Sequence, residues 1–243
     1  MTERIVLYDI PSKNHTSWSE NVWKAKPLPT QARLVLNYKK IPYETKWIEY
    51  PEIGPTFKAL GIPPNSPPKW SDWSVPTVQM LDGSYIMGSA AIAQKLEELY
   101  PEPSLHLDAD IHEKVESAHL QMMFPNMPYF MPKIRKRILG EGSAAWFKAD
   151  REKRSGMPEE QWETDDRVGE EGLAEMVELL TKYKRDEGPF ILGSEPSYGD
   201  FIIAAMIDMF RCIGEEAYEK LVGYDTSLRK VYEACGAWLE KRN

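Results

Sequence analysis

The chain has 243 residues and a formal net charge of −8 at pH 7, and 42% of its residues are hydrophobic and 28% charged. This composition can bury a sizeable core and excludes an intrinsically disordered chain, while the length allows one large domain or two modest ones. The negative charge argues against nucleic acid or an anionic membrane as the main partner.

The first hundred residues mix strand and helix patterns. Residues 5–8 form a short apolar run that fits a buried strand, residues 32–40 have helical periodicity, and residues 44–48 predict a second strand. Prolines recur between residues 61 and 74, so this segment cannot be a regular helix. A strand, a helix and a strand followed by a hairpin and a helix are typical of a thioredoxin-like domain.

Residues 77–80 and 84–87 are predicted to form an antiparallel β-hairpin. Asp82 and Gly83 between them suit a two-residue type I′ turn. Pro76 precedes the first strand, where it need not donate an N–H to the sheet. The backbone beside this proline can therefore face a ligand.

Ser89 opens the predicted helix 90–100. Free N–H groups and the helix dipole favour a carboxylate at a helix N-terminus. A strand with a free backbone edge beside such a helix start suits a small peptide-like ligand. The alternative interpretation is an ordinary hairpin followed by a helix.

Pro101 and Pro103 interrupt the chain after this helix and predict a linker at residues 101–107. We therefore expect two domains, at residues 1–100 and 108–243, with helical patterns throughout the second.

Two patterns stand out in the second domain. Ser197 and Asp200 form a Ser-x-x-Asp capping box directly before the apolar run 201–210, which predicts the start of a buried helix and a structural role for Asp200. Three prolines in residues 123–132 must bend or break the helix there.

The histidines do not predict a metal site. His112 and His119 are seven residues apart, and no cysteine or paired carboxylate joins them at ligand spacing. Cys212 and Cys235 are too few for a disulfide framework. The first residues lack a signal-peptide pattern, and no apolar stretch is long enough for a bilayer. We therefore expect a soluble cytoplasmic protein with no metal, no nucleic-acid partner and no membrane partner.

The hairpin, Ser89, the linker and the capping box at Ser197 together resemble the glutathione S-transferase superfamily over most of the chain. The resemblance implies an N-terminal thioredoxin-like α/β domain, a C-terminal all-α helical bundle, glutathione as cofactor and a homodimer. It also implies a cis proline and a serine that holds the γ-glutamyl carboxylate, and hence a glutathione site at Val75, Pro76, Gly88 and Ser89. Gly88 departs from the family, in which an acidic residue commonly precedes the serine.

The proline-rich loop supplies further candidates for glutathione binding. Lys69, Trp70 and Trp73 are predicted to hold the glycyl end of glutathione.

Residues 18–24, Trp-Ser-Glu-Asn-Val-Trp-Lys, are similar to the Trp-Ser-x-Asn-x-Trp-Lys motif of fungal glutathione transferases related to the bacterial β-aryl etherases. The resemblance implies that Ser19 faces the glutathione sulfur, with Asn21 as a second donor. Ser17 is the alternative, although Ser17 and Glu20 match the spacing of a helix cap. Tyr8 stands where tyrosine-type members place their hydroxyl, but the etherase-like group does not use it.

The glutathione chemistry that the resemblance implies needs the sulfur of glutathione as a thiolate. A free thiol has a pKa near 8.5, and lowering it by about two units requires roughly 2.7 kcal/mol. One charge-assisted hydrogen bond contributes about 1.5–3 kcal/mol, and a helix N-terminus adds about 0.3–1 kcal/mol. Together they supply the free energy needed to lower the thiol pKa. No cysteine occupies the predicted site, which weakens the alternative of a thiol–disulfide reaction.

The chain also departs from that group by an insertion at residues 25–31, where Pro27 and Pro29 must break the first helix. We interpret it either as a surface excursion or as a wall over the substrate cleft. The cleft is expected between the domains, bordered by residues 122–131.

The resemblance implies a glutathione-dependent enzyme that acts on a bulky hydrophobic electrophile through a serine-stabilised thiolate, by conjugation or ether cleavage. One alternative is a glutathione-dependent cis–trans isomerase of fungal secondary metabolism, in which reversible addition to a conjugated alkene returns glutathione. A further alternative is a non-catalytic binding protein for apolar metabolites, since a fold does not fix a function.

Overall fold

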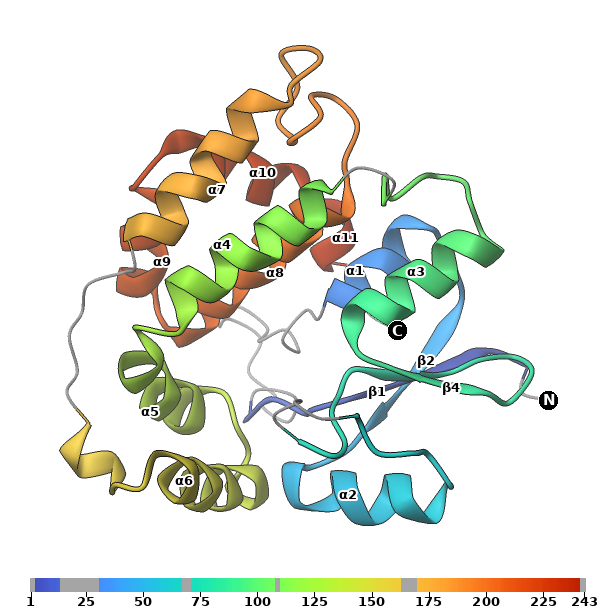
Figure 1. The fold of residues 1–243 in the computed structure, drawn as a ribbon, viewed down its shortest axis with the longest axis vertical. Helices are drawn as coiled ribbons and strands as arrows, with labels where there is room; N and C mark the ends of the chain where they lie inside the picture. The colour runs from blue at the N-terminus through green and yellow to red at the C-terminus, as the bar shows by residue number, and fades with distance from the viewer. Residues whose placement is uncertain (1–2, 14–30, 67–70, 108–109, 163–169, 241–243) are drawn as a thin grey trace, which may run out of the picture.

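A small mixed sheet with its helices forms one half of the molecule, and helices alone form the other half (Figure 1). The computed structural model describes residues 3–13, 31–66, 71–107, 110–162 and 170–240. No helix among these residues has the length and apolar character needed to cross a bilayer.

The sheet has the strand order β2-β1-β3-β4. Alternate residues of its central strand face opposite sides: Ile5 and Leu7 join the core under α1 and α3, whereas Val6 and Tyr8 pack with α2. This is the thioredoxin-like arrangement expected from the sequence. The elements of this half are β1 (Ile5–Asp9), α1 (Gln31–Tyr38), β2 (Tyr43–Trp47), α2 (Tyr50–Ala59), β3 (Thr77–Gln79), β4 (Tyr85–Met87) and α3 (Ser89–Leu99).

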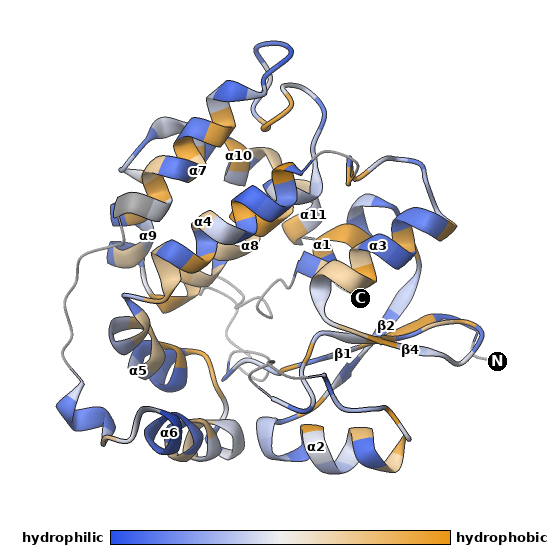
Figure 2. Cartoon of the chain, in the orientation of Figure 1, coloured by the Kyte–Doolittle hydropathy of each residue, from blue (hydrophilic) through white to orange (hydrophobic). Residues whose placement is uncertain are grey.

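The other half packs its helices around α8, and the mixture of hydrophobic and hydrophilic residues along α4 and α7 marks both as amphipathic (Figure 2). Its elements are α4 (Ile111–Met123), α5 (Met127–Arg137), α6 (Glu141–Ser155), a 3₁₀ turn (Glu159–Gln161), α7 (Glu170–Lys182), α8 (Tyr198–Ile213), α9 (Glu215–Val222), α10 (Thr226–Ala234) and α11 (Gly236–Glu240). The domain limits at residues 100 and 108 stay a prediction.

The predicted hairpin of β3 and β4 is confirmed, but the prediction of a two-residue type I′ turn between these strands is wrong. The N–H of Gly83 donates to the carbonyl of Met80 at 3.0 Å, and the N–H of Met80 donates to the carbonyl of Ser84 at 2.8 Å, so the loop has three residues. Gly83 has a φ of 88°, whereas Leu81 and Asp82 keep negative φ. The carboxylate of Asp82 accepts hydrogen bonds from the N–H and hydroxyl of Ser84, and this local bonding favours the longer loop.

α2 is absent from the elements predicted above, because its prolines obscure the helical pattern. Pro51 falls in the first turn, where a helix needs no N–H from it, and Glu49 with Glu52 forms a capping box. Pro55 lies inside the helix and is accommodated there.

The helix is broken within the proline-containing segment 123–132, as predicted. The break falls at residues 124–126, and Pro128 lies in the first turn of α5. Pro132 lies inside α5 and does not break that helix.

The start of α8 confirms the capping box. The Asp200 carboxylate accepts hydrogen bonds from the N–H of Ser197 at 2.7 Å, from the Ser197 hydroxyl at 2.7 Å and from the N–H of Ile191 at 2.9 Å. Burial raises the pKa of Asp200 to about 6, against the opposing effect of these hydrogen bonds. Asp200 therefore has a structural role.

Replacing Asp200 by alanine is expected to destabilise the fold by about 2–4 kcal/mol. The lost cap accounts for about 0.5–2 kcal/mol, and the buried N–H of Ile191 left without an acceptor adds about 1–3 kcal/mol. Urea unfolding checks this, with Asp225→Ala as control: Asp225 caps α10 through one bond to the N–H of Ser227 at 2.8 Å and should cost only about 1 kcal/mol. Equal losses in the two variants would contradict the central role of Asp200.

Candidate active site

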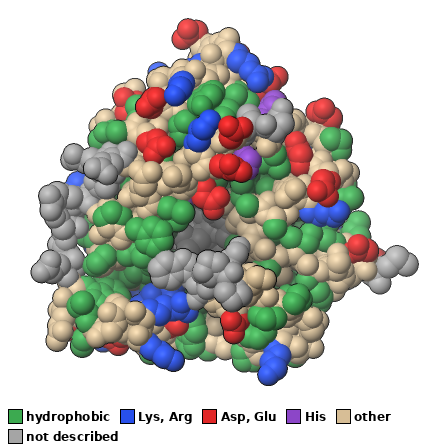
Figure 3. Space-filling model, in the orientation of Figure 1, with side chains coloured by type: hydrophobic (Ala, Val, Ile, Leu, Met, Phe, Trp, Pro, Cys, Tyr) green, Lys and Arg blue, Asp and Glu red, His purple; other side chains and the backbone are tan. Residues whose placement is uncertain are grey.

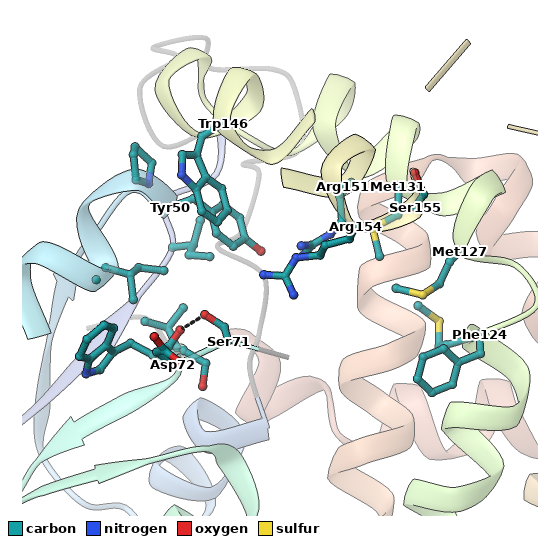
Figure 4. A pocket seen from close by; sticks show the side chains of 18 of the residues that line it. Tyr50, Ser71, Asp72, Phe124, Met127, Met131, Trp146, Arg151, Arg154 and Ser155 are labelled. Carbon is teal, nitrogen blue, oxygen red and sulfur yellow. Dashed lines mark hydrogen bonds between the residues drawn. The ribbon is translucent and has the colours of Figure 1, made fainter. Parts of the chain in front are cut away.

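A cavity of about 1280 Å³ lies between the two halves of the molecule. α2 and the loop at residues 71–75 form one wall, and the end of α4 with α5 and α6 forms the other (Figure 4). The face of the molecule drawn in Figure 3 has a hollow near its centre, beside a group of hydrophobic side chains. Four large apolar side chains that line it are more than a third exposed: Leu120, Phe124, Trp146 and Met157.

The Val75–Pro76 peptide bond is cis, as the resemblance implies, and Val75 lines the cavity. The chain is held on both sides of Val75, because Thr77 Oγ1 donates to the carbonyl of Ser74 at 2.8 Å and the N–H of Gly88 donates to the carbonyl of Pro76 at 3.0 Å. Within the described residues, the N–H and C=O of Val75 itself make no hydrogen bond. They can therefore pair with the backbone of a peptide-like ligand.

Ser89 is the first residue of α3, and Gly88 is its N-cap. The Ser89 hydroxyl is half-buried and has no hydrogen-bond partner in the part of the chain that the structure describes. Gly88 has a φ of 97°, a conformation that an acidic residue would adopt only with strain, although a Cβ there would meet no neighbour within 4 Å. Backbone geometry therefore explains why glycine replaces the acidic residue common in the resembled family.

Several predicted site residues lie outside the described residues: Ser17, Ser19, Asn21, Lys69 and Trp70. Trp73 lines the cavity, but its indole N–H donates to the carbonyl of Ile62 at 2.9 Å. This N–H is therefore not available for the glycyl carboxylate.

Tyr8 lies away from the cavity, between Phe57 and Tyr85 in the core beneath α2. Burial, together with the nearby Tyr85 hydroxyl, raises the pKa of Tyr8 to about 12. The geometry agrees with the expectation that this tyrosine does not serve the thiol.

The predicted wall at residues 122–131 is divided between cavity and core. Met122 and Phe130 are fully buried in the helical core. The side chains that reach the cavity are Met123, Phe124, Met127, Pro128 and Met131.

α6 and α2 bring aromatic and basic residues to the cavity that the sequence pattern alone does not predict. Trp146 of α6 stacks on Tyr50 of α2, with ring centroids 5.5 Å apart and planes 8° apart. Arg151 and Arg154 lie one and two turns further along α6 and point into the cavity (Figure 4). The sequence shows the spacing of these residues along α6, but it does not show that α6 packs on α2.

A hydrogen-bonded contact holds α6 against α2. The buried hydroxyl of Ser143 donates to the Glu49 carboxylate and accepts the N–H of Tyr50 at 2.9 Å. This contact fixes the start of α6 against the start of α2, and so the two walls relative to each other.

His119 lines the cavity at the end of α4. Burial lowers its pKa to about 4, so the imidazole is neutral at neutral pH. It adds a polar group to the wall but no charge.

Two family profiles match the chain. One, described as the N-terminal domain of glutathione S-transferase, matches residues 27–99, and the other, described as the C-terminal domain, matches residues 110–238.

Among known proteins, the chain is 26% identical over 245 residues to the glutathione S-transferase-like protein ustS of Aspergillus flavus, a match that covers 92% of this chain and 86% of the relative. The crystal structure of glutathione transferase GSTFuA3 from Phanerochaete chrysosporium is similar with a TM-score of 0.81 and 25% identity, covering both chains fully. A glutathione S-transferase of Ceriporiopsis subvermispora, crystallised in complex with glutathione, is similar with a TM-score of 0.80 and 25% identity over 99% of each chain.

Truncating Trp146 to alanine is expected to weaken the binding of a neutral apolar probe, N-phenyl-1-naphthylamine, by roughly five- to thirtyfold. The variant loses about 1–2 kcal/mol of aromatic contact in the cavity. Fluorescence titration measures the change. Leu99→Ala, on the exposed side of α3, should leave the affinity unchanged, and an equal loss in that variant would show that the probe binds elsewhere.

Proposed function

The chain belongs to the glutathione S-transferase family, and we propose that it uses glutathione to act on a bulky hydrophobic electrophile, by conjugation or ether cleavage. The observation that carries the proposal is the juxtaposition of a large apolar cavity with the unpaired backbone of Val75 beside the cis Pro76. The cavity accommodates an apolar substrate, and the backbone of Val75 accommodates a peptide-like cofactor.

Glutathione is proposed to bind along the loop that leads into β3. The N–H and C=O of Val75 would pair with the cysteinyl backbone, and Ser89 with the N-terminus of α3 would hold the γ-glutamyl carboxylate. The glutathione bound to the Ceriporiopsis subvermispora relative supports this choice of cofactor.

The thiolate is proposed to be stabilised by Ser19, with Asn21 as a second donor and Ser17 as the alternative. A hydroxyl donating to the sulfur favours the charged form and lowers the pKa of the thiol. The apolar surroundings of the cavity then place the thiolate where water competes little for it.

The electrophile is proposed to lie against the methionines of α4 and α5 and the stacked rings of Tyr50 and Trp146. Methionine side chains adapt to irregular apolar shapes, and aromatic rings supply large contact areas. The size of the cavity fits a bulky substrate.

Ser89→Ala is expected to weaken glutathione binding about tenfold, because a charge-assisted hydrogen bond to the γ-glutamyl carboxylate is lost. Isothermal titration calorimetry measures the dissociation constant. Ser84→Ala is the matched control, since that hydroxyl bonds Asp82 in the hairpin loop. Unchanged binding in Ser89→Ala, or the same loss in both variants, would count against the proposed site.

Ser19→Ala is expected to raise the thiol pKa of bound glutathione by about one to two units and to slow turnover, while the free energy of unfolding stays the same. Thiolate absorbance against pH measures this shift of the thiol pKa. An unchanged thiol pKa in the variant would transfer the role to Ser17 or Asn21.

The fate of glutathione separates the candidate reactions. With substrates from a screen of conjugated apolar electrophiles, we expect one glutathione to be consumed for each product molecule formed. Turnover without loss of thiol would instead indicate the isomerase considered above.

A further inference from the structure

We propose that the hydroxyl of Tyr50 donates a hydrogen bond to the carbonyl oxygen of a conjugated ketone or aldehyde, on which negative charge develops when glutathione adds to the conjugated double bond. The proposal rests on the proposed function for the glutathione thiolate. It makes Tyr50 a catalytic residue and names a conjugated carbonyl compound as the class of electrophile. The donor itself is assigned from the contacts of α2 with α6.

The ring of Tyr50 is fixed by contacts within the protein. Tyr50 is the first residue of α2, and its N–H donates to Oγ of Ser143 at 2.9 Å. Its ring stacks on that of Trp146, and the ring of Phe147 lies against it with centroids 5.4 Å apart and planes at 54°. Packing of this kind leaves the ring one orientation, so the hydroxyl points in one direction. A donor held in this way needs no reorganisation when it meets a ligand.

The hydroxyl of Tyr50 lacks the partner that other tyrosines of the molecule have. The hydroxyls of Tyr43, Tyr198 and Tyr232 each donate to another side chain, at 3.0, 3.0 and 2.5 Å. The Tyr50 hydroxyl makes no hydrogen bond with any residue in the described ranges, and it is directed into the cavity (Figure 4). A polar group that the fold leaves unpaired beside a cavity is available to a ligand.

The groups that face this hydroxyl in Figure 4 do not accept its proton. They are the guanidinium ends of Arg151 and Arg154, which also line the cavity. A guanidinium group has N–H donors and no acceptor. The O–H of Tyr50 therefore needs an acceptor that the ligand supplies.

Tyr50 is a neutral donor at neutral pH. Burial raises the pKa of its hydroxyl, and the Arg151 cation acts in the opposite direction with a smaller effect. A phenol that keeps its proton stabilises a neighbouring charge by hydrogen bonding. This favours a carbonyl oxygen, whose developing charge needs only a hydrogen bond, over the alkoxide leaving group of an ether, which needs a proton.

The reaction balances without a further reagent. The thiol of glutathione loses its proton to water, and the thiolate sulfur forms a bond to the β-carbon of the conjugated system. The electron pair of the carbon–carbon double bond shifts toward the carbonyl group and produces an enolate oxygen, to which the Tyr50 hydroxyl donates. The α-carbon then takes a proton from water and the carbonyl bond forms again.

Tyr50 lies on the same wall of the cavity as the proposed glutathione site, because α2 and the loop that contains Val75 form that wall together. Only two carbon atoms separate the attacked carbon from the carbonyl oxygen, so the sulfur and the donor must act close to each other. His119 is another neutral polar residue of the lining, but it lies at the end of α4 on the opposite wall.

The test compares two electrophiles that share a naphthyl group. The ketone 4-(1-naphthyl)-3-buten-2-one has the conjugated carbonyl, whereas 1-(bromomethyl)naphthalene reacts by loss of bromide and has no oxygen. Tyr50→Phe keeps the stacked ring. It is expected to lower kcat/KM for the ketone about 10- to 100-fold, mainly through kcat, and to leave kcat/KM for the bromide within about twofold.

Two further variants serve as controls. Tyr224→Phe removes the hydroxyl of an exposed tyrosine and should leave both rates unchanged. His119→Phe removes the other neutral polar group and should not lower the ketone rate selectively. Equal losses for both electrophiles in Tyr50→Phe, no loss for either, or a ketone-selective loss only in His119→Phe would overturn the proposal and leave the proposed function standing. The free energy of unfolding of Tyr50→Phe should match that of the intact protein, since the hydroxyl bonds no other described group.

Infrared spectroscopy of the bound ketone tests the hydrogen bond without turnover. We expect a lower carbonyl stretching frequency in the intact protein than in Tyr50→Phe, because a donor to the oxygen weakens the C=O bond. The same frequency in both proteins, or no binding of the ketone, would overturn the proposal. If the frequency differs as expected but the intact protein turns over neither electrophile with glutathione, the hydrogen bond stands and the proposed function fails.

Discussion

The burial of α8 is the constraint on which the rest of the structure depends. The helix is apolar on nearly all sides, so it is stable only when other elements surround it. α4, α5, α9 and α10 do so within the helical half, and α1 does so from the sheet half, where the rings of Tyr38 and Phe201 meet edge to face at 5.2 Å. Asp200 fixes where the helix begins. Because one helix contacts both halves, its placement sets how far apart they stand, and therefore the width of the cavity between them.

Backbone breaks then give the cavity its shape. The chain turns at residues 124–126 instead of continuing α4, so α5 packs on α8 and on α6, and α6 in turn reaches α2. The hydroxyl of Ser143 ties α6 to the start of α2, and the stack of Trp146 on Tyr50 extends this contact into the cavity. Both walls are thus held by contacts within the protein, before any ligand binds.

Local sequence signals predict the parts of this molecule that depend on local physics. The hairpin, the helix start at Ser89 and the cap at Asp200 follow from spacing and residue type, and the structure confirms them as elements. The prediction of a type I′ turn fails because the hydrogen bonds between Asp82 and Ser84 outweigh the general preference of an Asp-Gly pair for that turn. The basic side of the cavity could not be predicted, since Arg151 and Tyr50 are far apart in sequence and meet only when α6 packs on α2.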